Sequence, residues 1–365
     1  MSRLAARVLA LAAVATLAGS GGPALAAGIA ASVPGDSITY VTDPELASTP
    51  IQAFHQQGGP TLLLSDAPED VPGPGILYQD DVNGPFRLFF DHVAATASGA
   101  PLAFTVLATN RGTAAVTITL TRVGYAGPSE NYIATGQAAQ RAWMTSSLST
   151  ALVVPPGQTS YLLPQVPSWT ARAQQDVTGI IDGTADADVV LSVVAESTPA
   201  ASLQGLTILP APLDPTGFAL RGTFPQADVT LQAQADGAFQ HLDMAQPTDY
   251  LRGYSAVDNL APAEDYGNYG VLYDVRVMVM GNAGRLAAVF DPQGGPFAGA
   301  GLIGTGFGPG TAVDLPSGGT FARSALASIL LGQFTLVRNA SLLLRFQWMP
   351  PAGSYLPASL ILSPY

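Results

Sequence analysis

Short segments in which apolar and polar residues alternate recur along the whole chain. Residues 101–110 read PLAFTVLATN and residues 114–123 read AAVTITLTRV, and both are rich in β-branched residues. Alternation with a period of two is typical of a strand that buries one face. The chain also has 39 Gly and 30 Pro residues, which favour turns between such segments. Short strands separated by turns at this spacing predict an all-β fold built from β-sandwiches.

The same pattern predicts further strands on both sides of a Pro-rich stretch near the middle of the chain. Those before it are residues 36–42, 61–65, 75–79, 86–93, 151–154, 159–163, 176–181 and 188–196. Those after it are residues 228–234, 270–280, 285–291, 298–303, 312–315, 340–348, 356–363 and a run inside 321–337. Gly-containing turns at 110–113 and 281–284 predict two hairpins, each joining the strands on either side of the turn.

The chain is long enough for two domains. Residues 199–216 contain four Pro residues and break the strand pattern, so they are predicted to be a linker. We therefore expect two tandem β-sandwich domains, at residues 28–198 and 217–365, with one short helical insertion in the first.

The first 27 residues have the features of a secretory signal peptide. Arg3 and Arg7 precede an apolar run at 8–18, and the A-x-A sequence at 24–26 forms a cleavage site. The apolar run is shorter than the roughly 20 residues that a membrane-spanning helix needs. Removal of both Arg residues changes the net charge from −12 to −14. We expect an exported protein, secreted or held at the cell surface or in the periplasm, with no transmembrane segment in the mature chain.

Composition excludes several functional classes. The chain has no Cys, which excludes disulfides and Cys-based zinc sites. Its sequence pI is about 4.4 and all 14 basic residues are Arg, set against 26 acidic residues. Phosphate contacts need basic patches, so nucleic acid is not an expected partner. A cell-envelope protein or a polysaccharide is the kind of partner that an exported acidic protein would meet.

Several stretches resemble known bacterial proteins. The turn at 110–113 and the VPPGQT sequence at 154–159 resemble bacterial immunoglobulin-like and fibronectin-like surface modules. Other stretches resemble a group of secreted bacterial proteins with tandem immunoglobulin-like β-sandwich domains, sometimes associated with copper amine oxidase N-terminal-like domains. These stretches are residues 75–80, 87–92, 127–129, 269–273, 294–299 and 350–360. The resemblance implies an exported two-domain β protein and implies no catalytic residues.

Copper amine oxidase chemistry does not follow from this resemblance. That chemistry needs an Asn-Tyr-Asp/Glu motif, but Tyr132 is followed by Ile and Tyr269 by Gly. The three His residues, His55, His92 and His241, have no metal-ligand spacing to one another. The chain also lacks a Gly-x-Ser-x-Gly elbow and a phosphate-binding loop. No catalytic residue and no cofactor are therefore predicted.

One acidic segment suggests a metal site. Asp182, Asp186 and Asp188 place three carboxylates within seven residues. Sandwich proteins bind calcium through carboxylates in inter-strand loops, so these residues are the candidate metal ligands. The full EF-hand order is absent, and solvated turn carboxylates are the alternative interpretation.

Residues 130–146 predict the helix, with Ser129 as its N-cap. Tyr132, Gly136, Ala139 and Trp143 follow helical spacing and form one stripe. Aromatic and Arg side chains are enriched at binding hot spots, so Tyr132, Arg141 and Trp143 are the candidate binding residues. The alternative is that the stripe packs on the sandwich and closes one end of its core.

These observations lead to an expected function of binding or structural assembly at the cell surface or envelope, without catalysis. Two alternatives stay open. One is a secreted carbohydrate-active hydrolase whose carboxylate pair is formed by residues distant in sequence. The other is a module that binds calcium or a small ligand.

Overall fold

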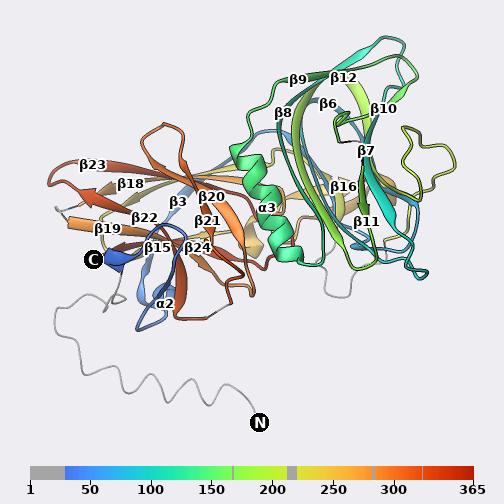
Figure 1. Ribbon diagram of the computed structural model, residues 1–365. Coiled ribbons are helices and arrows are strands. Elements are labelled where there is room, and N and C mark those ends of the chain that lie inside the picture. Colours follow the sequence, from blue (N-terminus) through green and yellow to red (C-terminus); the bar gives the residue numbers. More distant parts are fainter. Residues whose placement is uncertain (1–28, 167, 212–219, 282–283, 323) are drawn as a thin grey trace.

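The computed structural model describes residues 29–166, 168–211, 220–281, 284–322 and 324–365 (Figure 1). The predicted signal peptide, 1–27, and residues 212–216 of the predicted linker lie outside the described residues. The described chain is dominated by strands, so the prediction of an all-β fold is confirmed. Among the described residues the α-helices are α2 (Pro44–Ala47) and α3 (Tyr132–Thr145), and the 3-10 helices are η1 (Ile29–Ala31), η2 (Pro247–Asp249) and η3 (Ala256–Asp258).

Two six-stranded sheets, A and B, form one sandwich. In order across sheet A the strands are β1 (Ser37–Thr39), β22 (Ala327–Leu336), β19 (Gly284–Pro292), β24 (Ala358–Pro364), β15 (Gln240–Met244) and β2 (Thr49–Pro50). In order across sheet B they are β21 (Thr311–Leu315), β20 (Gly299–Thr305), β23 (Ser341–Trp348), β18 (Leu272–Met280), β14 (Asp228–Ala235) and β3 (Ala53–Gly58). Alternate side chains from the facing strands fill a single core, with Val275 and Val277 of β18 packed in the same cluster as Leu286 and Phe290 of β19.

Sheet C has twelve strands and is strongly bent. Its two long strands, β6 (Gly75–Ala94) and β12 (Asp176–Glu196), pair along most of their length, with a break in register between Ala185 and Val189. The first half of β12 also pairs with β8 (Val116–Ser129), and the second half with β7 (Leu102–Thr109). The other strands are β4 (Thr61–Ser65), β5 (Asp70–Val71), β9 (Thr150–Val154), β10 (Thr159–Tyr161), β11 (Trp169–Ala171), β13 (Arg221–Phe224), β16 (Arg252–Ser255) and β17 (Ala261–Glu264). An apolar core of its own lies within this bent sheet.

Neither predicted hairpin forms. The strands on either side of the turn at 110–113, β7 and β8, pair with opposite halves of β12. Those on either side of 281–284, β18 and β19, belong to sheets B and A. A short connection can lead to another sheet, as at 281–284, or to a different half of the same neighbouring strand, as at 110–113, and alternation does not distinguish either from a hairpin. Asn110 is fully buried and donates to the carbonyls of Ala114 and Val154, which fixes the connection between β7 and β8.

The strand pairing does not follow the predicted domain boundaries. The N-terminal strands β1, β2 and β3 pair with β22, β15 and β14, so they complete the sandwich formed mostly by the C-terminal part. Conversely, β13, β16 and β17 extend sheet C next to β4. The described part of the predicted linker, 199–211, lies along β6, where the Ile76 N–H donates to the Thr207 carbonyl and the Ile76 carbonyl accepts from the Leu209 N–H.

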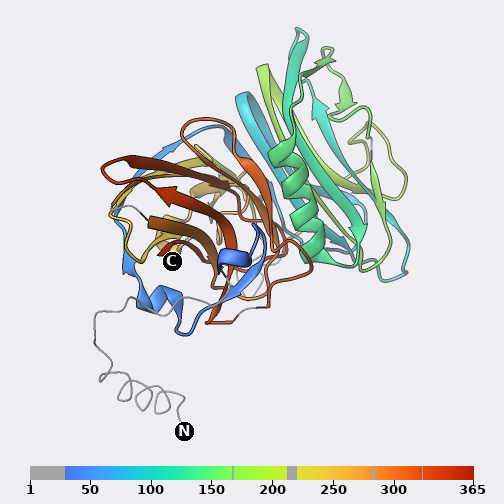
Figure 2. The same cartoon turned by 60° about the vertical axis from the view of Figure 1, so that its left-hand side comes forward.

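Helix α3 lies between sheet C and the sandwich of sheets A and B (Figures 1 and 2). It packs against β8 and β12 on one side and β20 and β21 on the other. Its N-cap is Asn131, whose side chain accepts from Ala134 N–H, and not Ser129 as predicted. Ser129 is the last residue of β8, so the strand continues to the point where the prediction began the helix.

Candidate functional site

The candidate binding residues on α3 do not form an exposed surface. Trp143 is 0% exposed, and its ring is flanked by the guanidinium groups of Arg87 and Arg122, 4.8 and 5.0 Å from the ring centroid. The hypothesis that Trp143 contacts a partner is therefore wrong. A large aromatic ring on a helix between two β-units is more strongly stabilised by burial than by exposure.

The other residues singled out on the helix also contact the protein itself. Arg141 forms an ion pair with Asp314 of β21, with 2.5 Å between Nη1 and Oδ1. The Tyr132 hydroxyl donates to the Gln174 carbonyl at 3.3 Å. Gly136 lies against the backbone of Ala352, so the close backbone approach predicted for this Gly occurs within the chain. The helix therefore packs at the junction, which was the alternative interpretation of its stripe.

The three candidate calcium ligands have separate partners. Asp182 accepts two hydrogen bonds from the buried Arg87 guanidinium, at 2.8 and 3.2 Å. Asp186 accepts from Thr117 N–H and Asp188 from the Asn83 amide, both carboxylates being exposed. No group of three acidic or His side chains in the described part of the chain is arranged to hold a metal ion. The candidate metal site is therefore not formed.

The three His residues lie apart. His92 is fully buried and bridges Ser65 and the Pro68 carbonyl, at 2.9 and 3.0 Å. Burial lowers the pKa of His92 to about 4, so it is neutral at physiological pH. His241 bonds the Ser48 hydroxyl, and His55 is exposed on β3. These contacts give His92 and His241 structural roles.

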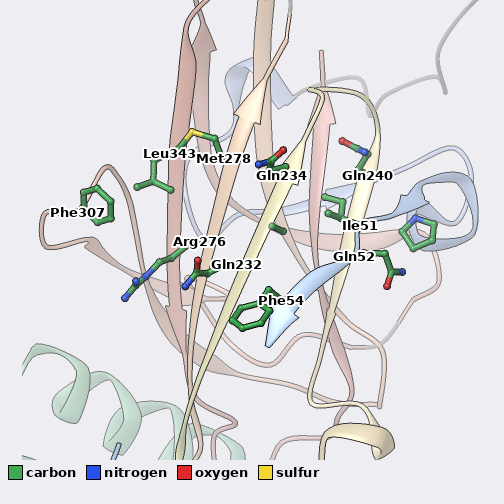
Figure 3. Close-up of a pocket in the computed structure, with 12 residues that line it drawn as sticks. Ile51, Gln52, Phe54, Gln232, Gln234, Gln240, Arg276, Met278, Phe307 and Leu343 are labelled. Carbon is green, nitrogen blue, oxygen red and sulfur yellow. The ribbon is translucent and has the colours of Figure 1, made fainter. Parts of the chain in front are cut away.

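A groove on the outer face of sheet B is the strongest candidate for a binding site (Figure 3). Its volume is about 750 Å³. It lies where the chain leaves β2 in sheet A and crosses to β3 in sheet B. Its lining residues are Pro50, Ile51, Gln52, Phe54, Gln232, Ala233, Gln234, Gln240, Arg276, Met278, Phe307 and Leu343.

Strand alternation places the polar residues of the groove. In β14 the side chains of Leu231, Ala233 and Ala235 are buried in the core, so Gln232 and Gln234 point outward. The pairing of β3 with β14 ends at Ala233, so no residue of β3 lies opposite Gln234. Register then aligns Phe54, Gln232 and Arg276 across three neighbouring strands, as Figure 3 shows.

Two phenylalanines border the groove with exposed rings. Phe54 of β3 is 66% exposed and Phe307 is 80% exposed. Phe307 lies in the turn between β20 and β21, and Gly306 N–H of that turn donates to the Leu343 carbonyl at 2.8 Å. Two exposed Phe rings that border one groove, together with its apolar lining, form a surface of the kind that contacts ligands.

An ion cluster supports the floor of the groove. Asp274 of β18 accepts hydrogen bonds from Arg276 on the same strand and from Arg345 of β23, the latter at 2.7 and 3.0 Å. Burial alone would raise the pKa of Asp274, but the hydrogen bonds from Arg345 and Arg276 outweigh it and lower the pKa. The carboxylate therefore stays ionised and holds both guanidinium groups in position.

The groove contains no proton-transfer pair. None of its lining residues is Asp, Glu or His, the residue types that act as general acids and bases. The side chains that line it are instead amide, guanidinium and apolar groups. Such a surface can hold a polar ligand without reacting with it.

Carboxylates do meet elsewhere, but in the interior. Asp66, Asp91, Asp176 and Asp265 interact where β4, β6 and β12 meet the segment after β17. Burial and mutual repulsion raise the pKa of Asp66 and Asp176, and Asp176 and Asp265 are 1% and 0% exposed. A glycosidase pair needs a cleft that admits the sugar and water. Asp176 and Asp265 are buried, Asp66 and Asp91 are half-buried, and none of the four lines the groove on sheet B.

The groove residues were not singled out from the sequence. Strand β14 was predicted, and its LQAQA alternation at 231–235 is the signal that could have pointed to Gln232 and Gln234. Strand β3 reads AFHQQG and was not predicted, because both of its faces are largely exposed at the sheet edge. The Arg276–Asp274–Arg345 cluster joins residues about 70 positions apart, which only the pairing of β18 with β23 brings together.

Comparisons with known proteins leave the function open. No protein-family model and no curated protein matches the chain. Among solved structures, a xanthan lyase from Paenibacillus is similar over 81% of this chain and 27% of its own length, with 11% identity and a TM-score of 0.16. A likeness of this degree carries no argument about fold or activity. Within the described residues, neither helix has the length and apolar character to span a bilayer.

Proposed function

We propose that this is an exported, non-catalytic protein that binds an extended carbohydrate chain in the groove on sheet B. The observation that carries the proposal is the lining of the groove. Four Gln side chains, one Arg and two exposed Phe rings line it, with no acidic or His side chain among them. The predicted signal peptide supports export.

The four amides suit hydroxyl-rich ligands. Each Gln side chain offers two N–H donors and a carbonyl acceptor, and a sugar hydroxyl can both donate and accept. Gln52, Gln232, Gln234 and Gln240 come from three parts of the chain, so their amides are spread along the groove. This arrangement favours several hydrogen bonds along an extended ligand over one deep pocket for a small molecule.

The exposed rings suit the apolar faces of sugars. The C–H groups on one face of a pyranose ring pack against an aromatic ring, and the burial of both surfaces stabilises the complex. Phe54 and Phe307 both line the groove, and Arg276 and Gln232 lie between them in Figure 3. A chain of sugar units lying across Gln232 would contact both rings.

Affinity electrophoresis in native gels tests this proposal. Gels containing xylan, dextran, alginate or polygalacturonate should retard the mature protein in at least one case. Phe54→Ala and Gln232→Ala should each weaken the affinity by about tenfold, which corresponds to about 1.4 kcal/mol and is the effect of a hot-spot residue.

Gln57→Ala is the matched control. Gln57 is also exposed and lies on β3, but it is not part of the groove lining. It should leave both the retardation and the melting temperature unchanged. Migration unaffected by all four polysaccharides, or retardation that survives both groove substitutions, would reject the proposal.

A further inference from the structure

The two guanidinium groups beside the groove share a single carboxylate. Arg276 and Arg345 are directly opposite each other in the pairing of β18 with β23. Like charges in this position repel, and Asp274 lies between them and accepts from both. A single Arg would satisfy Asp274, so the cluster keeps one positive charge in excess.

Both guanidinium groups retain a donor nitrogen. Arg276 uses Nε and Nη2 on Asp274, and Arg345 also uses Nε and Nη2. Neither Nη1 has a hydrogen-bond partner among the described residues. The Arg276 and Arg345 side chains are 34% and 23% exposed, and their direct pairing places both on one face of sheet B, where Arg276 lines the groove and Arg345 lies beside it.

The local charge contrasts with that of the whole chain. The chain has 26 acidic and 14 basic residues, yet Arg276 is the one charged side chain among the groove-lining residues. A fixed guanidinium fork matches a carboxylate in shape and charge and gives stronger hydrogen bonds than a neutral group would.

From this geometry we infer that the carbohydrate bound in the groove is an acidic polysaccharide, whose uronic acid carboxylates accept hydrogen bonds from Nη1 of Arg276 and Arg345. The inference rests on the proposed function and adds the ligand class to it. Hydroxyls of the same sugar unit then reach Gln232, which is aligned with Arg276 in register. Asp274 acts as a positioning residue because it holds both forks in place.

The test compares two polymers that differ only in their acid groups. Calorimetric titration would use polygalacturonate and the same polymer after its carboxyl groups have been reduced to primary alcohols. The wild-type protein should bind polygalacturonate about tenfold more tightly than the reduced polymer. That preference should weaken as salt is added, because charge attraction at a partly exposed site is screened.

Substitution of Arg276 separates charge recognition from the groove itself. Arg276→Gln should reduce the preference, because only Arg345 then remains to bind the carboxylates, and it should weaken binding of polygalacturonate more than binding of the reduced polymer. Asp274 keeps its bonds to Arg345 in this variant, so the melting temperature should change little. Arg252→Gln is the control, since Arg252 is 86% exposed at the edge of sheet C and should leave the preference intact.

Each outcome decides between the two proposals. Equal affinity of the wild-type protein for both polymers overturns the inference and leaves the proposed function standing. Loss of binding to the reduced polymer in Arg276→Gln also overturns it, because Arg276 would then contact the sugar in general and not its carboxylate. Absence of binding to either polymer, or to any neutral glycan, overturns both.

Discussion

At the scale of single residues, Gly136 shows how packing overrides helix propensity. Gly costs a helix interior about 1 kcal/mol relative to Ala. Here it lies where the segment after β23 crosses α3, and an added Cβ would overlap the Ala352 carbonyl oxygen. The position therefore tolerates no side chain, although the helix alone would favour one.

Gly136→Ala should destabilise the protein by about 1–3 kcal/mol, the usual cost of overpacking. Equilibrium unfolding in urea would measure the change. Ala138→Gly, at an exposed position of the same helix, should cost about 1 kcal/mol through propensity alone. A Gly136→Ala protein more stable than wild type would show that α3 does not approach Ala352 in this way.

At the scale of elements, α3 joins sheet C to sheet B through buried hydrogen bonds. The Gln140 amide donates to the Met349 carbonyl and accepts from Ala300 N–H, the latter at 2.6 Å. Gln140 is completely buried, so water cannot replace these bonds. Gln137, one turn earlier, donates to Gly299 and Pro316 from a half-buried position.

Gln140→Ala should therefore cost more stability than Gln137→Ala. Removing Gln140 leaves a buried N–H and a buried C=O without partners, at about 1–3 kcal/mol for each. Water can hydrate the carbonyls left by Gln137→Ala, so its effect should be under about 1 kcal/mol. Differential scanning calorimetry of the two variants would measure the order, and equal melting temperatures would contradict this account of the junction.

A strand could be predicted from the sequence when one of its faces is buried and the other is exposed. Strands with one buried face, such as β18 and β23, show alternation and were predicted. The long strands β6 and β12 were each predicted as two, because polar residues occupy the bend where the register breaks. Residues 199–211 contain Pro but still pack on β6, so composition alone suggested a freer linker than the structure has.

The site was less predictable than the fold for a related reason. Helix α3 carries an aromatic and Arg pattern that is typical of hot spots, but the same pattern suits a helix packed between two β-units. Side chains that line the groove come from strands distant in the chain, and each looks ordinary in its own segment. Only the register across β3, β14, β18 and β23 brings them together.

At the scale of the whole molecule, the buried carboxyls should couple stability to pH. Burial first, and then repulsion by Asp91, raises the pKa of Asp176 far above the ordinary value for Asp. Asp176 therefore keeps its proton in the folded protein at pH values where the unfolded chain has lost it. Stability from this group is present below about pH 4 and is lost as the pH rises toward the folded pKa.

Two other titrating groups, Asp291 and His92, determine the pH range in which the effect of Asp176 can be measured. Burial raises the pKa of Asp291 to about 7, so its contribution is also lost as the pH rises from about 4 to 7. His92 has a pKa of about 4 in the folded protein, so its contribution to stability increases as the pH rises from about 4 to 6.5. Above pH 7 neither Asp291 nor His92 changes its protonation further. The cluster of carboxyls around Asp176 then determines how stability depends on pH.

The free energy of unfolding should therefore fall between pH 7 and pH 9. Asp176→Asn mimics the protonated carboxyl and should reduce this slope by up to about 1.4 kcal/mol per pH unit. Urea unfolding of both proteins across this range would measure it. Asp186→Asn, at an exposed position, is the control and should keep the wild-type slope. A wild-type stability that is flat or rising above pH 7 would contradict the raised pKa values.

Methionine methyl NMR would show whether a ligand occupies the groove. Met278 lines the groove, whereas Met144, Met244 and Met349 are buried elsewhere. In protein labelled with ¹³C at the Met methyl groups, titration with an oligogalacturonate should shift the Met278 signal saturably and leave the three buried signals in place. Phe54→Ala should weaken that response. An unchanged Met278 signal at saturating ligand, or shifts confined to the buried methionines, would contradict the account.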